Sequence, residues 1–150
     1  MIAIENRRAR HDYEILETHE AGIELTGSEV KSIRAGKASI KEAFVRVVKD
    51  EEAWLFNMHI ARYESADPRT APDEKRSRRL LLHKKEIVKL AERVKLERLA
   101  IVPLKLYFNK ANRVKAQIAL GRGKKLHDKR EAIKERDIKM DLKRLTKKRL

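Results

Sequence analysis

The stretch YEILETHEAGIELTGSEVKSIRAG, residues 13–36, predicts a β-strand that runs directly into a short helix. One face of the first half carries residues that alternate with a period of two: Tyr13, Ile15, Glu17, His19, Ala21, Ile23 and Leu25. Five of these seven are apolar or aromatic and the opposite face is mostly polar, which is typical of a strand with one buried side. In the second half, Thr26 and Glu29 form a capping-box pair, and Gly36 can close the helix in a left-handed conformation.

Further strands and a second helix follow. The other strand segments are residues 44–48, 54–60, 101–108 and 114–120. The second helix is expected at about residues 83–95. Its apolar side chains recur at helical spacing at Ile87, Leu90, Ala91 and Val94. The pattern predicts five or six antiparallel strands with one buried face, and the spacing of Trp54 and Phe56 places both in the core.

Short helices within an otherwise all-β chain favour a small closed barrel over a sandwich. An oligonucleotide-binding fold is the leading candidate, although short strands by themselves do not separate it from other barrels. Residues 64–79 contain Pro68 and Pro72 and are expected to form a mobile loop. The predicted fold class is therefore mainly β with short helices. We expect a barrel domain at residues 1–120 and a basic tail at 121–150.

The composition favours a polyanionic partner. The 150 residues include 38 Lys and Arg against 23 Asp and Glu, a net charge of +15. No apolar run approaches the roughly 20 residues that span a bilayer, and residues 1–10 turn basic too early for a secretory signal. Cysteine is absent, so disulfides and thiolate metal sites are excluded. A protein without disulfides fits a reducing cytoplasm. No metal, cofactor or membrane role is expected.

The last 30 residues form a strongly basic segment. Residues 121–150 hold 13 Lys and Arg against five Asp and Glu, and Ile138, Leu142 and Leu145 form a narrow apolar stripe. An isolated helix of this length is marginal in water. We therefore expect this tail to be disordered in the free protein and helical on a polyanionic surface.

Three clusters could contact nucleic acid. The first is Asn6, Arg7, Arg8, Arg10 and His11, whose guanidiniums can fork onto phosphates while Asn6 and His11 reach base or ribose edges. The second is Lys31, Ser32, Arg34 and Lys37, on and just after the capped helix. The third is residues 121–130, where two glycines precede Lys124, Lys125, His127, Lys129 and Arg130. Each could instead be a solvated basic surface.

The residue types favour a folded RNA as the partner. Aromatics make up only 5% of the chain, too few for stacking on successive bases of a single strand. No helix-turn-helix, basic zipper or zinc-finger spacing indicates duplex DNA reading. The pairs His11–Asp12 and His127–Asp128 are weak catalytic signals, since neighbouring residues on a strand point to opposite faces. A metal-free ribonuclease stays open as a minor alternative.

Several blocks in order along the chain resemble the SsrA-binding protein family (small protein B). The blocks are Asn6 to Tyr13, Glu20 to Ile23, Gly27 with Glu29 to Lys37, Arg79 to His83, Pro103 to Phe108, and Gly123 to Arg130. The resemblance covers nearly the whole chain. The turn at residues 109–113 departs from it, since it lacks the glycine expected in the family's last hairpin, and the tail's apolar stripe is slightly different from that of some relatives.

The resemblance implies a barrel of the oligonucleotide-binding type that grips the tRNA-like domain of transfer-messenger RNA. The expected RNA-binding residues are Asn6, Arg7, Arg8, Arg10, His11, Glu20, Gly22, Lys31, Arg34, Lys37, Leu81, His83, Lys124 and Lys125. Glu20 is informative, because a carboxylate cannot attract phosphate but can accept a hydrogen bond from a base amino or imino group. Composition alone would not select it.

The resemblance also gives the tail a role in the mRNA channel and decoding centre of a stalled ribosome. The expected tail contacts are His127, Asp128, Lys129, Arg130, Ile138, Lys139, Lys143 and Arg144. The implied protein is a non-enzymatic cytoplasmic factor, one copy per RNA, that takes no small-molecule substrate and supports tagging of the nascent chain. The main alternative is a ribosomal or ribosome-assembly protein with a basic tail threading ribosomal RNA.

Overall fold

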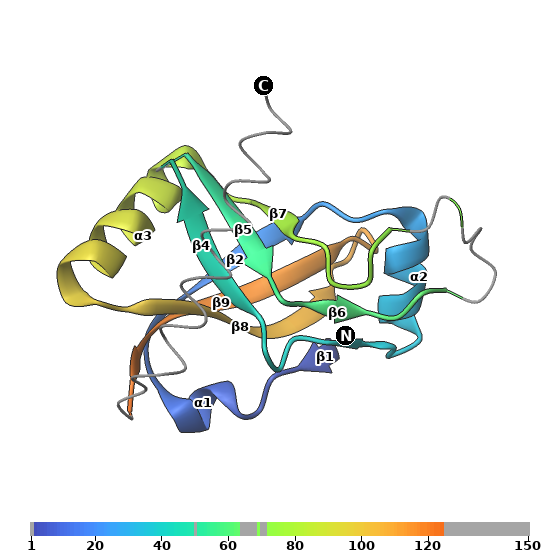
Figure 1. Cartoon of the computed structure of the whole chain (residues 1–150), viewed down its shortest axis with the longest axis horizontal. Helices are drawn as coiled ribbons and strands as arrows, with labels where there is room; N and C mark the ends of the chain where they lie inside the picture. Colours follow the sequence, from blue (N-terminus) through green and yellow to red (C-terminus); the bar gives the residue numbers. More distant parts are fainter. Residues whose placement is uncertain (1, 50, 64–68, 70–71, 125–150) are drawn as a thin grey trace.

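A closed antiparallel barrel forms the body of the protein in the computed structural model (Figure 1), which describes residues 2–49, 51–63, 69 and 72–124. Its helices are α1 Ala9–Asp12, α2 Gly27–Arg34 and α3 Lys84–Glu97. Its strands are β1 Ile2–Glu5, β2 Tyr13–Ile23, β3 Ala38–Ser39, β4 Phe44–Val48, β5 Glu52–Phe56, β6 His59–Ile60, β7 Arg78–Leu81, β8 Ala100–Phe108 and β9 Val114–Gly123.

The largest sheet closes on itself. Its strand order is β1-β8-β4-β5-β7-β2-β9, and a further pairing of β8 with β9 joins the two ends. Since β9 occupies one edge of β8, strands β1 and β4 share the other edge, β1 at residues 105–107 and β4 at Ile101. The expected closed barrel is confirmed. Its ring has six strands, one more than a five-stranded oligonucleotide-binding barrel, and β3 with β6 forms a separate small sheet.

Strand β2 serves two apolar clusters, contrary to the prediction of one shared face. A register shift between Ile15 and Glu17 turns the strand over. Before it, Tyr13 and Ile15 pack under α1 on a small cluster made of Ala9, Val102, Leu104 and Ala119. After it, Ala21 and Ile23 enter the barrel core. The shift lets one strand hold both the barrel and the N-terminal helix.

Residues 54–60 were expected to form one strand, but the structure divides them between two. The chain turns at Asn57, whose φ is +61°, so β5 ends at Phe56 and β6 begins at His59. Phe56 is buried as predicted and stacks on Phe44 with ring centroids 5.6 Å apart. The core prediction for Trp54 is wrong: Ala53 and Leu55 point into the barrel, and Trp54 lies half-buried on the outer face.

Both predicted helices are present. In α2, the Glu29 backbone N–H donates to Thr26 Oγ1 at 3.3 Å, and the Thr26 N–H donates to Glu29 Oε1 at 2.9 Å. Gly36 has the expected positive φ of +75°. Helix α3 starts after His83 and buries Ile87, Leu90 and Ala91 beside the β4–β5 hairpin (Figure 1). Within the described part of the chain, no helix is long and apolar enough to cross a membrane.

Local geometry at three segments bears on the sequence predictions. Residues 64–79 were expected to form a mobile loop. Its end is corrected, because β7 starts at Arg78, whose side chain is fully buried, while residues 64–68 and 70–71 lie outside the described part of the chain. The turn at 109–113 compensates for its missing glycine, since Asn112 adopts a φ of +59° and Asn109 Oδ1 accepts from the N–H groups of Ala111 and Arg113. Strand β9 continues to Gly123, so the domain boundary expected at residue 120 falls inside it.

Candidate nucleic-acid interface

Four of the expected RNA-binding residues meet in one open groove. Glu20 and Gly22 come from β2, Leu81 from the end of β7, and His83 from the start of α3. The groove has a volume of about 710 Å³ and is also lined by Lys115 of β9. Gly22 and Leu81 pair directly across the two strands. The sequence separates these residues widely, and barrel closure brings them together.

Leu81 gives the groove an apolar feature on its surface. Leu81 is 49% exposed, and of the three large hydrophobic residues exposed in the described part of the chain it is the one that lies on a strand. A Cβ atom at Gly22 would lie 3.2 Å from Leu81 Cβ and 3.4 Å from its Cδ1. Glycine at position 22 therefore lets Leu81 lie flat against β2, and a larger residue would displace it.

Glu20 is oriented by a tyrosine that lies two strands away. Strand β9 runs between β2 and β8, and Tyr107 reaches across it to donate its hydroxyl hydrogen bond to Glu20 Oε2. Burial, followed by this hydrogen bond and the charge of Glu20, raises the pKa of Tyr107 to about 12. The phenol is therefore a fixed donor at neutral pH. Tyr107 is half-exposed while the next residue, Phe108, is buried, because neighbouring residues on a strand point to opposite faces.

The N-terminal basic residues form a surface with the end of β9. Lys124 Nζ donates to the Arg10 carbonyl at 3.2 Å, and the Lys124 N–H donates to the Asp12 carbonyl at 3.0 Å. Arg7 is 90% exposed on its side chain, and Arg8 pairs with Asp12 at 3.5 Å. We call Arg7, Arg8, Arg10, His11 and Lys124 the α1 surface. The helical turn of α1 also brings His11 within 3.3 Å of Asp12, which an extended strand would have prevented.

Asn6 does not belong to that surface, contrary to the expectation that it reaches a base or ribose. Its side chain is buried, and Nδ2 donates to the carbonyls of Ile40 and Pro103, both at 3.3 Å. Its backbone N–H donates to the Leu104 carbonyl at 2.7 Å. Asn6 therefore ties the end of β1 to β8 and to the segment after β3. Sequence reasoning could not see this, because its partners are distant backbone carbonyls.

A second basic surface lies on α2, on a different side of the barrel from α1 (Figure 1). Lys31 Nζ is 5.4 Å from the centroid of the Tyr63 ring, and the Arg34 guanidinium is 4.8 Å from that of Phe108. Lys37 is exposed just beyond the helix. We call Lys31, Arg34 and Lys37 the α2 surface. Aromatic rings hold two of its cations in fixed positions.

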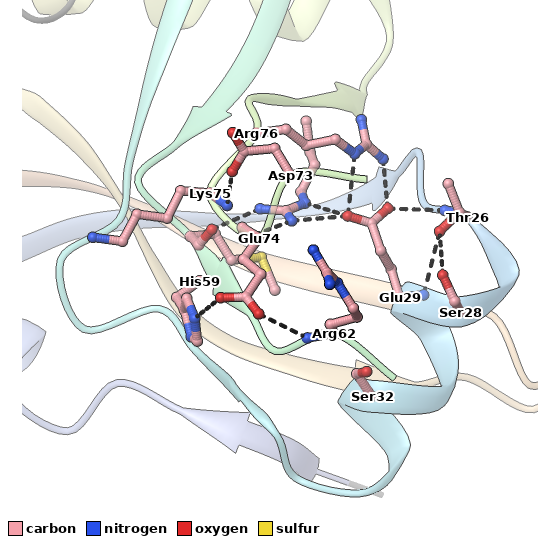
Figure 2. Close-up of polar contacts among 12 residues, drawn as sticks. Thr26, Ser28, Glu29, Ser32, His59, Arg62, Asp73, Glu74, Lys75 and Arg76 are labelled. Atoms are coloured by element: carbon pink, nitrogen blue, oxygen red, sulfur yellow. Dashed lines mark hydrogen bonds and ion pairs between the residues drawn. The ribbon is translucent and has the colours of Figure 1, made fainter. Parts of the chain in front are cut away.

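A buried ionic cluster that the sequence did not reveal holds α2 in place (Figure 2). Glu29 accepts from Arg76 Nη2 at 2.5 Å and from Arg78 Nη2 at 2.8 Å. Arg78 is fully buried and also donates to the carbonyls of Met58 at 2.6 Å and Glu74 at 3.0 Å. Burial alone would raise the pKa of the Glu29 carboxyl, but hydrogen bonds from Arg76, Thr26 and Arg78 outweigh it and hold that pKa below its ordinary value.

The remaining expected site residues lie outside the described part of the chain. These are Lys125, His127, Asp128, Lys129, Arg130, Ile138, Lys139, Lys143 and Arg144. The predictions that the tail is disordered when free and helical when bound also fall on those residues.

Known proteins resemble this chain over nearly its whole length. The family model described as "SmpB protein" matches residues 3–148. The SsrA-binding protein of Desulforamulus reducens is 51% identical over 145 residues, 97% of this chain and 89% of the relative. That of Nitratiruptor sp. is 56% identical over 131 residues, 87% of each chain. A solved chain described as "tmRNA-SmpB: a journey to the center of the bacterial ribosome" matches with a TM-score of 0.69 and 47% identity, over 95% of this chain and 98% of that one.

Proposed function

The chain belongs to the SmpB protein family, and we propose that it binds transfer-messenger RNA and delivers it to stalled ribosomes, where the nascent peptide is tagged for degradation and the ribosome is released. The observation that carries this proposal is the match along nearly the whole chain to SsrA-binding proteins and to a tmRNA–SmpB structure of the ribosome. The protein acts as a binding factor in the cytoplasm and leaves peptide transfer to the ribosome.

The groove of Glu20, Gly22, Leu81 and His83 is the part of the protein that distinguishes this RNA from others. Its lining mixes the carboxylates of Glu20, Glu51, Glu52 and Glu86 with Arg79, Lys84 and Lys115, so as a whole it attracts phosphates less than a purely basic surface does. The oxygen of Glu20 that Tyr107 does not engage can accept from a base amino or imino group. Exposed Leu81 offers an apolar contact beside it. The groove therefore suits base edges and ribose.

Affinity comes from the α1 and α2 surfaces, which supply phosphate contacts on two sides of the barrel. Arg7, Arg10 and Lys124 are exposed on the first surface, and Lys31 and Arg34 are exposed on the second. Because α1 and α2 lie on different sides of the barrel (Figure 1), the two surfaces can meet a folded RNA backbone at separate points. Residues 125–150 add the ribosomal contacts expected from the family, in the mRNA channel and decoding centre. On this division, truncation after Asp128 leaves transfer-messenger RNA affinity nearly intact and abolishes tagging.

The first test is a salt-titrated binding comparison between transfer-messenger RNA and an elongator tRNA. We expect a preference for transfer-messenger RNA that persists at about 150–200 mM salt, where non-specific phosphate binding fades. Glu20→Gln should reduce that preference about tenfold, since a lost base contact is worth roughly 1–3 kcal/mol. Glu24→Gln is the matched control, an exposed glutamate just after the same strand. Equal affinities that fall together with salt would instead indicate a generic basic protein of the ribosomal type.

A further inference from the structure

A tryptophan between two arginines lies on the outer face of the barrel. Arg46 of β4 pairs directly with Trp54 of β5, and Trp54 pairs directly with Arg79 of β7. Residues that face each other across antiparallel strands project to the same side of the sheet. Since Ala53 and Leu55 fill the barrel core, the row Arg46–Trp54–Arg79 faces outward. All three side chains are partly exposed.

The indole ring is held by its edge. Trp54 Nε1 donates to Glu52 Oε2 at 3.0 Å, and the same oxygen lies 4.0 Å from Arg79 Nε. Glu52 thus satisfies the one polar group of the indole and anchors a neighbouring arginine. A ring fixed in this way loses little conformational freedom when a second flat group packs on its face.

The row continues directly into the proposed RNA groove. Glu52 and Arg79 line that groove together with Leu81, which follows Arg79 by two residues on the same face of β7. An RNA that contacts Glu20 and Leu81 therefore has a short path along β7 to Trp54. The other aromatic rings have contacts of their own. Phe56 and Phe108 are buried, Phe44 stacks on Phe56, and Tyr107 is hydrogen-bonded to Glu20. Tyr13 packs on the small apolar cluster, and the Lys31 ammonium lies over the Tyr63 ring.

We propose that Trp54 stacks on one unpaired base of the bound RNA, while Arg46 and Arg79 contact the phosphates on either side of that base. The proposal rests on the proposed function and adds a subsite to the same groove. Indole stacking accepts any base, because every base has a flat π face. Guanidiniums are suited to the flanking phosphates, since they donate in a planar fork.

Because Trp54 is the single tryptophan of the chain, its fluorescence reports on this subsite in the unmodified protein. Transfer-messenger RNA with a terminal dye is titrated against the full chain, and dye anisotropy and Trp54 emission are recorded together. We expect quenching that follows the anisotropy curve, with protection of the indole from acrylamide. Emission and acrylamide access that stay unchanged when anisotropy shows saturation would overturn the stacking proposal and leave the proposed function standing. Absence of any anisotropy change would overturn both.

Two substitutions separate stacking from packing. Trp54→Phe keeps a flat ring, whereas Trp54→Leu keeps an apolar side chain without one. We expect Trp54→Leu to weaken RNA binding about tenfold or more and Trp54→Phe to stay within about threefold of the wild type. Arg46→Gln and Arg79→Gln should each reduce the slope of log affinity against log salt, which the Trp54 variants leave unchanged. Equal affinities for the Phe and Leu variants would refute stacking even if emission changes on binding.

Discussion

Replacing Glu29 with glutamine should strongly destabilise the barrel, because it leaves a buried arginine without its counter-charge. The Glu29 and Arg78 side chains are only 3% and 0% exposed. Glutamine keeps the capping box, since its amide oxygen can still accept from the Thr26 N–H. The substitution therefore removes the negative charge of residue 29 and keeps the hydrogen bond that starts α2.

Removing one partner of a buried ion pair typically costs about 3–5 kcal/mol, because the other charge stays buried and unpaired. That is a large part of the roughly 5–15 kcal/mol that stabilises a domain. Arg78 keeps its bonds to the Met58 and Glu74 carbonyls, so we expect a loss near the lower end of that range, about 3 kcal/mol. For a domain of this size the melting temperature should fall by about 10 °C.

Thermal and urea unfolding at pH 7, followed by circular dichroism, measure the effect. Glu42→Gln is the matched control, since Glu42 is exposed and should change stability by less than about 0.5 kcal/mol. The double variant Glu29→Gln with Arg78→Met should recover part of the loss, because it removes the orphaned charge. A Glu29→Gln variant as stable as Glu42→Gln would refute the argument that Arg78 depends on this carboxylate.

Three further outcomes follow from the same geometry. The pKa of the Glu29 carboxyl in the folded protein lies below its ordinary value of 4.5. The stability that the charged carboxylate contributes is therefore complete above about pH 4.5 and is lost as the pH falls through the folded-state pKa. The free energy of unfolding of Glu29→Gln should depend less on pH in that acid range than that of the wild type. Thr26→Ala should cost about 1 kcal/mol in urea unfolding, since it removes the N-cap acceptor of α2. Gly22→Ala should displace Leu81 and weaken transfer-messenger RNA binding by more than it lowers stability, whereas Gly27→Ala, whose Cβ meets nothing within 4 Å, should not change binding.

Interactions between residues close in the chain were predictable from the sequence. The capping box joins residues three apart, and Gly36 follows the helix at the position where a left-handed residue is needed. Period-two alternation located the long strands of the barrel because burial of one face imposes it. The sequence favoured a closed barrel over a sandwich but could not show the closure itself, since the β8–β9 pairing that closes the ring has no local signature.

Contacts between distant residues account for what the sequence did not reveal. Glu29 and Arg78 are separated by 49 positions, and a charged residue on a short strand gives no sign that it is buried. Trp54 was placed in the core by its period-two spacing with Phe56, but Ala53 and Leu55 fill the core and Trp54 lies on the outer face. Glu20 came from the family resemblance alone, because one more carboxylate in a basic protein carries no compositional signal.

On the proposed function, the distribution of charge around the barrel offers a physical route by which a very basic protein selects one RNA. A uniform positive field would bind any polyanion, and its affinity would fall steeply with salt. Here none of the cations of the α1 and α2 surfaces lines the groove, and the groove itself mixes glutamates with Arg79, Lys84 and Lys115. An RNA held only through phosphates gains nothing from those glutamates. An RNA that presents base donors to Glu20 gains a contact there that does not depend on counterion release. Its preference over competitors should therefore persist as salt weakens the phosphate contacts common to both.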